Sequence, residues 1–206
     1  MYKAKTAYFD ESADAPWAAT EYGPDEIIKL ERLFKHTGSL SGCKVLEPGC
    51  GTGRLTEILS DRVGNEGSVA ALDISPMMVA EARRRTATRQ NVEIYLGPLE
   101  EFPMNENSYD LIICHQVFPH FEDKKKALIA LSEALKPDGT ISVIHFINFK
   151  EINDMHRKAG TAVEMDVMPE QNEMRRLFNE VGMEVAFILD DHLGYFLSAS
   201  RKHCGN

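Results

Sequence analysis

Short apolar runs of β type alternate with amphipathic segments of helical period through most of the chain. The runs predict strands that begin at Val45 and cover 68–72, 92–96, 110–114 and 140–144. The remaining segments predict helices over 24–35, 52–62, 76–89 and 124–136. Ser75 is the expected N-cap of the helix that starts with Pro76. This alternation predicts a parallel sheet built from right-handed βαβ units.

The alternation stops near the C-terminus. After a predicted helix at about 170–181, two further β-type runs cover 184–189 and 195–200, with only residues 190–194 between them. A crossover helix does not fit into so short a connection, so the two runs are predicted to pair antiparallel as a hairpin. The residues therefore predict an α/β fold with a mostly parallel sheet that ends in an antiparallel strand.

The size and composition are those of a soluble globular domain. With 206 residues, the chain is long enough to bury a core without disulfides or metals. Apolar residues make up 43% and charged residues 27% of the chain, which are ordinary values. No run approaches the roughly 18 apolar residues of a membrane-spanning helix, and the N-terminus lacks the apolar segment of a secretory signal. We therefore expect no membrane span.

Cysteine usage and charge indicate the compartment and the partner. Cys43, Cys50, Cys114 and Cys204 show no paired spacing, which favours reduced thiols in the cytoplasm over a disulfide or zinc framework. The net charge of −9 opposes binding to a phosphate backbone. The arginines within 83–89 and the lysines of 124–126 are interpreted as solvated helix faces. No nucleic-acid partner is expected.

The most informative segment is a glycine-rich loop at the end of the first predicted strand, Glu-Pro-Gly-Cys-Gly-Thr-Gly at 47–53. Gly49, Gly51 and Gly53 alternate there, and glycine allows positive φ angles and close approach of a ligand to the backbone. Open α/β sheets bind ligands at this carboxyl edge. Asp73 ends the second strand about 20 residues further on, where an acidic residue typically accepts hydrogen bonds from a ribose.

These residues predict an adenosine-containing cofactor but do not by themselves choose between NAD and S-adenosylmethionine. The loop has the spacing GxGxG, whereas the dinucleotide fingerprint is GxGxxG. A pyrophosphate favours a helix N-terminus, while S-adenosylmethionine carries a cationic sulfonium that an acidic residue such as Glu47 suits. The spacing favours S-adenosylmethionine.

Three segments resemble the class I S-adenosylmethionine-dependent methyltransferases. Glu47–Gly53 resembles their first motif, Ala71–Met78 their second-strand motif, and Leu135–Thr140 the turn before their fifth strand, with Asp138 where glycine is commoner. The resemblance covers residues 21–202 and points to small-molecule enzymes, loosely of the ubiquinone/menaquinone biosynthesis type. It implies a Rossmann-like three-layer α/β/α sandwich, whose mostly parallel seven-stranded sheet has an antiparallel C-terminal strand.

The resemblance also implies roles for residues of the first two motifs. Gly49, Gly51 and Gly53 would lie against the methionine and ribose parts of the cofactor. Glu47 would orient the loop or reach the methionine amino group through water. Asp73 would hold the ribose diol.

Further cofactor contacts are implied beyond these motifs. Ile74 would pack on the adenine, and the Leu99 N–H and Glu100 would bind the adenine edge. Pro98 departs from the family pattern, because an acid is commoner there and proline has no N–H to donate. His115 aligns with the position nearest the methionine moiety.

Histidines are the candidates for a general base at the acceptor, namely His115, His120, His145 and His156. A base helps only where the acceptor loses a proton, and imidazole suits that task near neutral pH. His115 and His145 lead, because they follow the fourth and fifth strands. The Asn/Asp-Pro-Pro-Tyr/Phe signature is absent after the fourth strand, which argues against an adenine or glutamine-amide nitrogen as acceptor. No ligand spacing supports a metal site.

The chain is predicted to be one methyltransferase domain over 1–206. Within it we expect an N-terminal lid or helical segment at 1–40, a cofactor-binding core at 41–147, a substrate-recognition insertion at 148–169 with a short helix at 152–160, and a C-terminal helix and hairpin at 170–206. The aromatic residues of the lid would be Tyr2, Tyr8, Phe9 and Trp17. Ordinary packing of this N-terminal segment is the alternative.

The predicted function is transfer of a methyl group from S-adenosylmethionine to a small-molecule acceptor by in-line displacement, with S-adenosylhomocysteine as the product. Two alternatives stay open: an NAD(P)-dependent oxidoreductase on the same scaffold, and a non-catalytic S-adenosylmethionine-binding protein. The acceptor, the methylated atom and the oligomeric state do not follow from the sequence.

Overall fold

The computed structural model describes residues 2–202. Its helices are α1 (Lys3–Glu11), α2 (Pro16–Ala19), α3 (Pro24–Thr37), α4 (Arg54–Val63), α5 (Pro76–Arg85), α6 (Lys124–Ala134), α7 (Phe149–Lys158) and α8 (Gln171–Glu180), with the 3₁₀ turns η1 (Leu99–Glu101) and η2 (Phe118–His120). The strands are β1 (Lys44–Pro48), β2 (Ser68–Asp73), β3 (Val92–Leu96), β4 (Tyr109–His115), β5 (Leu135–His145), β6 (Met183–Asp191) and β7 (Gly194–Arg201).

The strands form one sheet in the order β3-β2-β1-β4-β5-β7-β6. Strand β2 pairs parallel with β1 and β3, and β4 pairs parallel with β5, whereas β7 is antiparallel to both β5 and β6. This arrangement confirms the predicted Rossmann-like α/β class. By its internal contacts the chain divides into two compact units, residues 1–102 and 103–206. The organisation as a single domain stays a prediction.

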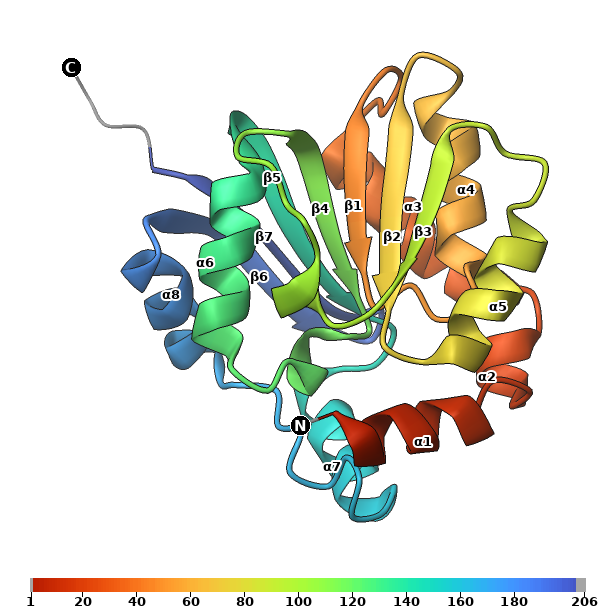
Figure 1. Ribbon diagram of the computed structural model, residues 1–206. Coiled ribbons are helices and arrows are strands. Elements are labelled where there is room, and N and C mark those ends of the chain that lie inside the picture. The colour runs from red at the N-terminus through yellow and green to blue at the C-terminus, as the bar shows by residue number, and fades with distance from the viewer. Residues whose placement is uncertain (1, 203–206) are drawn as a thin grey trace. The chain divides into compact units, whose positions relative to one another are not determined.

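In residues 1–102, the strands β1, β2 and β3 lie side by side with α4 and α5 packed against them (Figure 1). Gly53, the N-cap of α4, has a φ of 80°. A Cβ at this position would lie 2.9 Å from the Cα of Ala82 in α5. Glycine therefore permits the close approach of these two helices. Helix α4 begins at Arg54, two residues after the predicted start at Thr52.

In residues 103–206, α6 and α8 pack against each other beside the strands β5, β7 and β6 (Figure 1). The hairpin of β6 and β7 pairs Asp191 with Gly194, which confirms the antiparallel pairing predicted from the short connection. Gly194 has a φ of 97°, and a Cβ there would lie 2.2 Å from the carbonyl oxygen of His145. Glycine is thus required where the hairpin passes the end of β5.

Several element ends differ from the predicted ones. Helix α5 ends at Arg85, because the Thr86 hydroxyl donates back to the Ala82 carbonyl at 2.8 Å, so the predicted extension to residue 89 is wrong. Strand β5 begins at Leu135, which pairs with Tyr109 before the register shifts. Helices α1 and α2 lie within the segment at 1–40 that was expected to be a lid or helical, but no bounds were predicted for them; α1 buries no residue.

Two findings concern the predicted absence of a membrane span and the cysteines. Within residues 2–202, no helix is long and apolar enough to cross a membrane. Cys43, Cys50 and Cys114 carry reduced thiols, and burial raises the pKa of both Cys50 and Cys114. Cys204 lies outside the described residues.

Candidate functional site

The glycine-rich loop leaves the end of β1 and is held by main-chain hydrogen bonds to the end of β2. The N–H groups of Gly49 and Cys50 both donate to the Leu72 carbonyl, at 2.7 and 3.0 Å. Gly49, Gly51 and Gly53 have φ angles of 69°, 54° and 80°, in the left-handed region that favours glycine. The predicted reason for the three glycines, a backbone with positive φ, is thus present.

Asp73, at the end of β2, fixes the loop through its side chain. One carboxylate oxygen accepts the Gly51 N–H and the other accepts the Ser75 N–H, each at 2.9 Å. A carboxylate offers about four lone-pair positions, and this side chain is half buried. The aspartate therefore shapes the loop, and its carboxylate is the kind of group that accepts hydrogen bonds from a diol.

Glu47, in β1, is a buried carboxyl beneath the loop. Its Oε2 accepts the Thr56 hydroxyl at 2.6 Å. The pKa of Glu47 is raised to about 8, chiefly by burial; the Thr56 hydrogen bond lowers it and the Asp73 carboxylate makes a smaller contribution to the rise. A cationic group bound nearby would favour the ionised form, so the loop suits a ligand that carries positive charge.

The segment after β3 completes this group of residues within 1–102. The Gly97 N–H donates to the Asp73 carbonyl at 2.9 Å, which ties the end of β3 to the end of β2. Leu99 is buried in η1, while Glu100 is exposed and accepts the Tyr2 hydroxyl at 2.7 Å. Ile74 is half buried next to Asp73. The structure brings the predicted cofactor residues of this unit to the adjoining ends of β1, β2 and β3.

The N-terminal helices bind the same loops, a feature that the sequence predicted only as a possible lid. Asp10 of α1 accepts the Ser75 hydroxyl at 2.5 Å and the Met77 N–H at 3.0 Å. The Ala18 carbonyl accepts the Thr52 hydroxyl, and the Trp17 carbonyl accepts an Arg54 N–H. These acceptors are two main-chain carbonyls and one aspartate, so no residue pattern could have revealed them.

In residues 103–206, the four candidate histidines come together. His115 ends β4, His145 ends β5, His120 lies in η2 and His156 in α7. The rings of His120 and His156 are 4.8 Å apart, and the His115 ring is 4.7 Å from that of Phe146. Among the residues that the structure describes, no group of three or more His, Cys, Asp or Glu side chains is placed to hold a metal ion.

Burial and the neighbouring histidines lower the pKa of His145 and of His156, which favours the neutral form of both rings. Burial holds the pKa of His145 well below its ordinary value, and the nearby His115, His120 and His156 lower it further. Burial also lowers the pKa of His156, against a smaller opposing effect of Asp166. In the described part of the chain, the Nε2 atom of His145 is buried without a hydrogen-bond partner.

Asp166, which no sequence pattern indicated, contacts two of these histidines. Its Oδ2 lies 2.7 Å from Nδ1 of His120, and its carbonyl oxygen lies 2.6 Å from Nδ1 of His156. The Asn153 side chain bonds both the N–H and the carbonyl of Met168, at 2.8 and 3.2 Å. These hydrogen bonds hold the segment after α7 in place. Asp166 is 46 residues from His120 in the chain, so only the fold brings the two side chains together.

Gln116 follows His115 and has a φ of 54°, an uncommon left-handed conformation for a residue other than glycine. Its N–H donates to the Ile144 carbonyl at 2.8 Å. The chain therefore turns sharply at the end of β4, immediately after a candidate histidine. Such strained positions cluster at functional sites.

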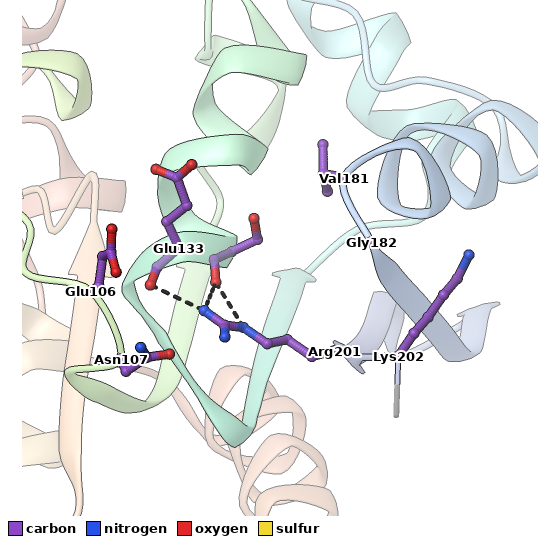
Figure 2. Close-up of a pocket in the computed structure, with 8 residues that line it drawn as sticks. Glu106, Asn107, Glu133, Val181, Gly182, Arg201 and Lys202 are labelled. Carbon is purple, nitrogen blue, oxygen red and sulfur yellow. Dashed lines mark hydrogen bonds between the residues drawn. The ribbon is translucent and has the colours of Figure 1, made fainter. Parts of the chain in front are cut away.

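A separate cavity of about 380 Å³ lies where β4, β5 and β6 begin, whereas His115 and His145 lie at the other ends of β4 and β5 (Figure 2). It is lined by Glu106, Asn107, Ser132, Glu133, Val181, Gly182, Arg201 and Lys202. The Arg201 guanidinium donates to the Ser132 carbonyl at 2.6 and 3.0 Å and to the Glu133 carbonyl at 3.1 Å (Figure 2). These carbonyls belong to the last turn of α6, so the charge caps a helix. We therefore do not assign the candidate site to this cavity.

Comparison with known proteins gives a family match. A family model described as a methyltransferase domain matches residues 39–182. Demethylmenaquinone methyltransferases of Staphylococcus aureus are 33% identical over 111 residues, which are 54% of this chain and 46% of the relative. The chain thus spans about half the length of the curated relatives it matches.

Solved structures share the fold. A SAM-dependent methyltransferase from Aquifex aeolicus has a TM-score of 0.66 at 23% identity, covering 87% of this chain and 97% of that one. Magnesium protoporphyrin IX methyltransferase from Synechocystis, solved with bound SAH, has a TM-score of 0.67 at 20% identity, covering 96% and 98%. At these identities the likeness concerns the fold.

Proposed function

Because this chain belongs to the methyltransferase-domain family, with S-adenosylmethionine as its cofactor, we propose that it transfers a methyl group to a small-molecule acceptor. The observation that carries the proposal is the glycine-rich loop in which Asp73 accepts the Gly51 and Ser75 N–H groups at 2.9 Å. This arrangement offers backbone without side chains beside a carboxylate that can accept a diol.

The residues that would hold the cofactor lie in residues 1–102. Asp73 would accept the ribose hydroxyls, and Ile74 would pack on the adenine. Gly49, Gly51 and Gly53 would let the backbone approach the methionine and ribose parts. The bound cofactor supplies an electrophilic methyl group on a sulfonium. Burial raises the pKa of Glu47, and the positive charge of the sulfonium would favour the ionised form of this carboxyl group.

Two further contacts belong to the same proposal. The Leu99 N–H and the Glu100 carboxylate would bind the adenine edge, and the Tyr2 hydroxyl, which donates to Glu100 at 2.7 Å, would hold that carboxylate. The assignment of His115 to the methionine moiety rests on the family resemblance and stays a prediction.

For the acceptor, we propose a quinone-type ring. The support is the similarity to demethylmenaquinone methyltransferases, which is limited to 111 residues at 33% identity. His115 and His145 stay the proposed catalytic histidines; both are buried at strand ends, and His145 is held neutral. We propose a cytoplasmic location on the free thiols alone.

Thermal unfolding tests the proposed function. S-adenosylhomocysteine or S-adenosylmethionine at about 100 times its dissociation constant should stabilise the protein by about 2.7 kcal/mol, which raises Tm by about 5–10 °C for a chain of this size. NADH under the same conditions should leave Tm unchanged. A rise with NADH and none with the adenosyl ligands would overturn the proposal in favour of an oxidoreductase.

A further inference from the structure

The contact between His120 and Asp166 has the geometry of a base held by a carboxylate. Nδ1 of His120 and Oδ2 of Asp166 are 2.7 Å apart. An ionised carboxylate only accepts hydrogen bonds, so Nδ1 must carry the proton. In a neutral ring the lone pair is then on Nε2, which is the tautomer that accepts a proton there.

His156 is fixed in the same tautomer but by a neutral partner. Its Nδ1 lies 2.6 Å from the carbonyl oxygen of Asp166, which also only accepts. A carboxylate stabilises an imidazolium far more than a carbonyl does. His120 therefore has a charged hydrogen-bond partner where His156 has a neutral one.

Exposure also separates the histidines. The side chains of His120 and Asp166 are 16% and 9% exposed, whereas His145 and His156 are each 4% exposed. A base must reach its substrate and later release the proton to water. Burial that keeps His145 neutral also opposes its taking up a proton. His120 thus combines the carboxylate partner with a route to solvent.

We propose that His120, oriented by Asp166, takes a proton from the methyl acceptor, and that the acceptor therefore presents a hydroxyl group on an aromatic or enolic carbon. The inference rests on the proposed function, with the quinone-type ring taken in its hydroxylated form. An amine acceptor is already nucleophilic when neutral, whereas a hydroxyl needs a base as the new bond forms. This assigns to His120 the base role that was predicted for His115 and His145, and it makes Asp166 a positioning residue.

The proton and electrons balance in this step. The O–H bond of the acceptor breaks, its proton passes to Nε2 of His120, and its electron pair stays on the acceptor. The acceptor forms the new bond to the methyl group while the sulfur–methyl bond breaks and its pair stays on sulfur. Nδ1 of His120 keeps its proton toward Asp166, and water later takes the proton from Nε2.

The charges that face His120 come from several elements. Asp166 is the carboxylate in direct contact with the ring. The Lys124 ammonium donates to the carbonyls of Pro119 and Phe121, the two residues that flank His120, at 3.0 and 3.2 Å. The His156 ring from α7 lies 4.8 Å away, and His145, whose pKa His120 helps to lower, is held neutral mainly by burial.

A purely structural role, in which the contact only fixes the segment after α7, makes different predictions. His120→Asn retains an N–H donor near the position of Nδ1, so it keeps the hydrogen bond to Asp166 but has no basic nitrogen. Asp166→Asn can present its amide N–H to Nδ1, which favours the tautomer with the proton on Nε2. His192→Asn, in the exposed turn between β6 and β7, is the matched control.

Nitrogen-15 NMR of the imidazole rings provides a test that needs no acceptor. At pH 8 the wild-type protein should show His120 with a proton on Nδ1 and none on Nε2. In Asp166→Asn the proton should shift toward Nε2, while His192→Asn should leave the His120 signals unchanged. A His120 ring protonated on Nε2 in the wild type would overturn the proposal.

Methyl transfer to hydroxylated ring probes, 1,4-dihydroxynaphthalene and catechol, tests the step itself, with 1-aminonaphthalene as the amine probe. His120→Asn should lower kcat by about 10²–10⁴-fold, with an unchanged Tm response to S-adenosylhomocysteine. An unchanged kcat, or transfer only to the amine, would overturn the inference. Absence of an S-adenosylhomocysteine response in the wild type would instead overturn the proposed function.

Discussion

The two units of this protein offer a ligand different kinds of chemistry. In residues 1–102 the candidate site consists of main-chain N–H groups in a glycine loop and of the carboxyl groups Glu47 and Asp73. In residues 103–206 it consists of imidazole rings around Asp166. A main-chain site depends on backbone conformation, while an imidazole site depends on protonation. The first is expected to fail on steric substitution and the second on a change of pH.

The largest effect is expected from Gly53→Ala. The new Cβ would meet the Cα of Ala82 at 2.9 Å and would force a side chain into a φ of 80°. Overpacking and strain together should lower the free energy of unfolding by about 2–4 kcal/mol. Gly64→Ala is the matched control, because its φ is 68° but nothing lies within 4 Å, so only the strain remains. Urea unfolding measures both, and equal losses would contradict the packing argument.

Asp73→Ala should have the next largest effect, on cofactor binding. The substitution removes the acceptor for the diol and for two loop N–H groups, so the dissociation constant for S-adenosylhomocysteine should rise about 10–100-fold. Isothermal titration calorimetry measures this. Asp61→Ala, which removes an exposed surface carboxylate that pairs with Arg89, should leave the affinity unchanged. Equal affinity in Asp73→Ala and wild type would remove Asp73 from the site.

Glu47→Gln should change how stability depends on pH. Since the pKa of Glu47 is raised from 4.5 to about 8, the folded protein keeps a proton in this range that the unfolded chain has released. Stability therefore falls as pH rises through this window, by at most about 1.4 kcal/mol per pH unit. Gln can still accept the Thr56 hydroxyl but cannot ionise, so the free energy of unfolding, measured with urea, should change less with pH in Glu47→Gln. An equal pH dependence in both proteins would exclude Glu47 as its origin.

His145→Phe should have the opposite and smallest effect. Because the pKa of His145 is held below its ordinary 6.5, the unfolded chain binds a proton below that pH which the folded protein does not. Stability is thus lost as pH falls below 6.5, and a phenyl ring of similar shape removes the loss. Tm in mildly acidic buffer should rise by a few degrees relative to wild type. A lower Tm at both acidic and neutral pH would show that the imidazole has a packing or hydrogen-bonding role instead.

Local sequence patterns predicted the glycine-rich loop in residues 1–102 better than the arrangement of the histidines in residues 103–206. The glycine spacing, Asp73 and the Ser75 N-cap are short-range signals, and the structure has each in the expected conformation. The hairpin followed from a connection too short for a crossover. Asp166 carries no such signal, because its partner His120 is brought to it only by the fold. The ends of α5 and β5 were missed because a side-chain cap and a register shift decide them.

Helix α1 buries no residue. Asp10 makes two hydrogen bonds, to Ser75 and Met77, and Phe9 packs against the buried cluster that contains Met78. In terms of amide hydrogen exchange, a terminal helix with no buried residue is expected to open as a unit of its own, at a free energy well below that of global unfolding. Because the Met77 N–H donates to Asp10, its exchange rate would report the opening of a helix more than sixty positions earlier in the chain.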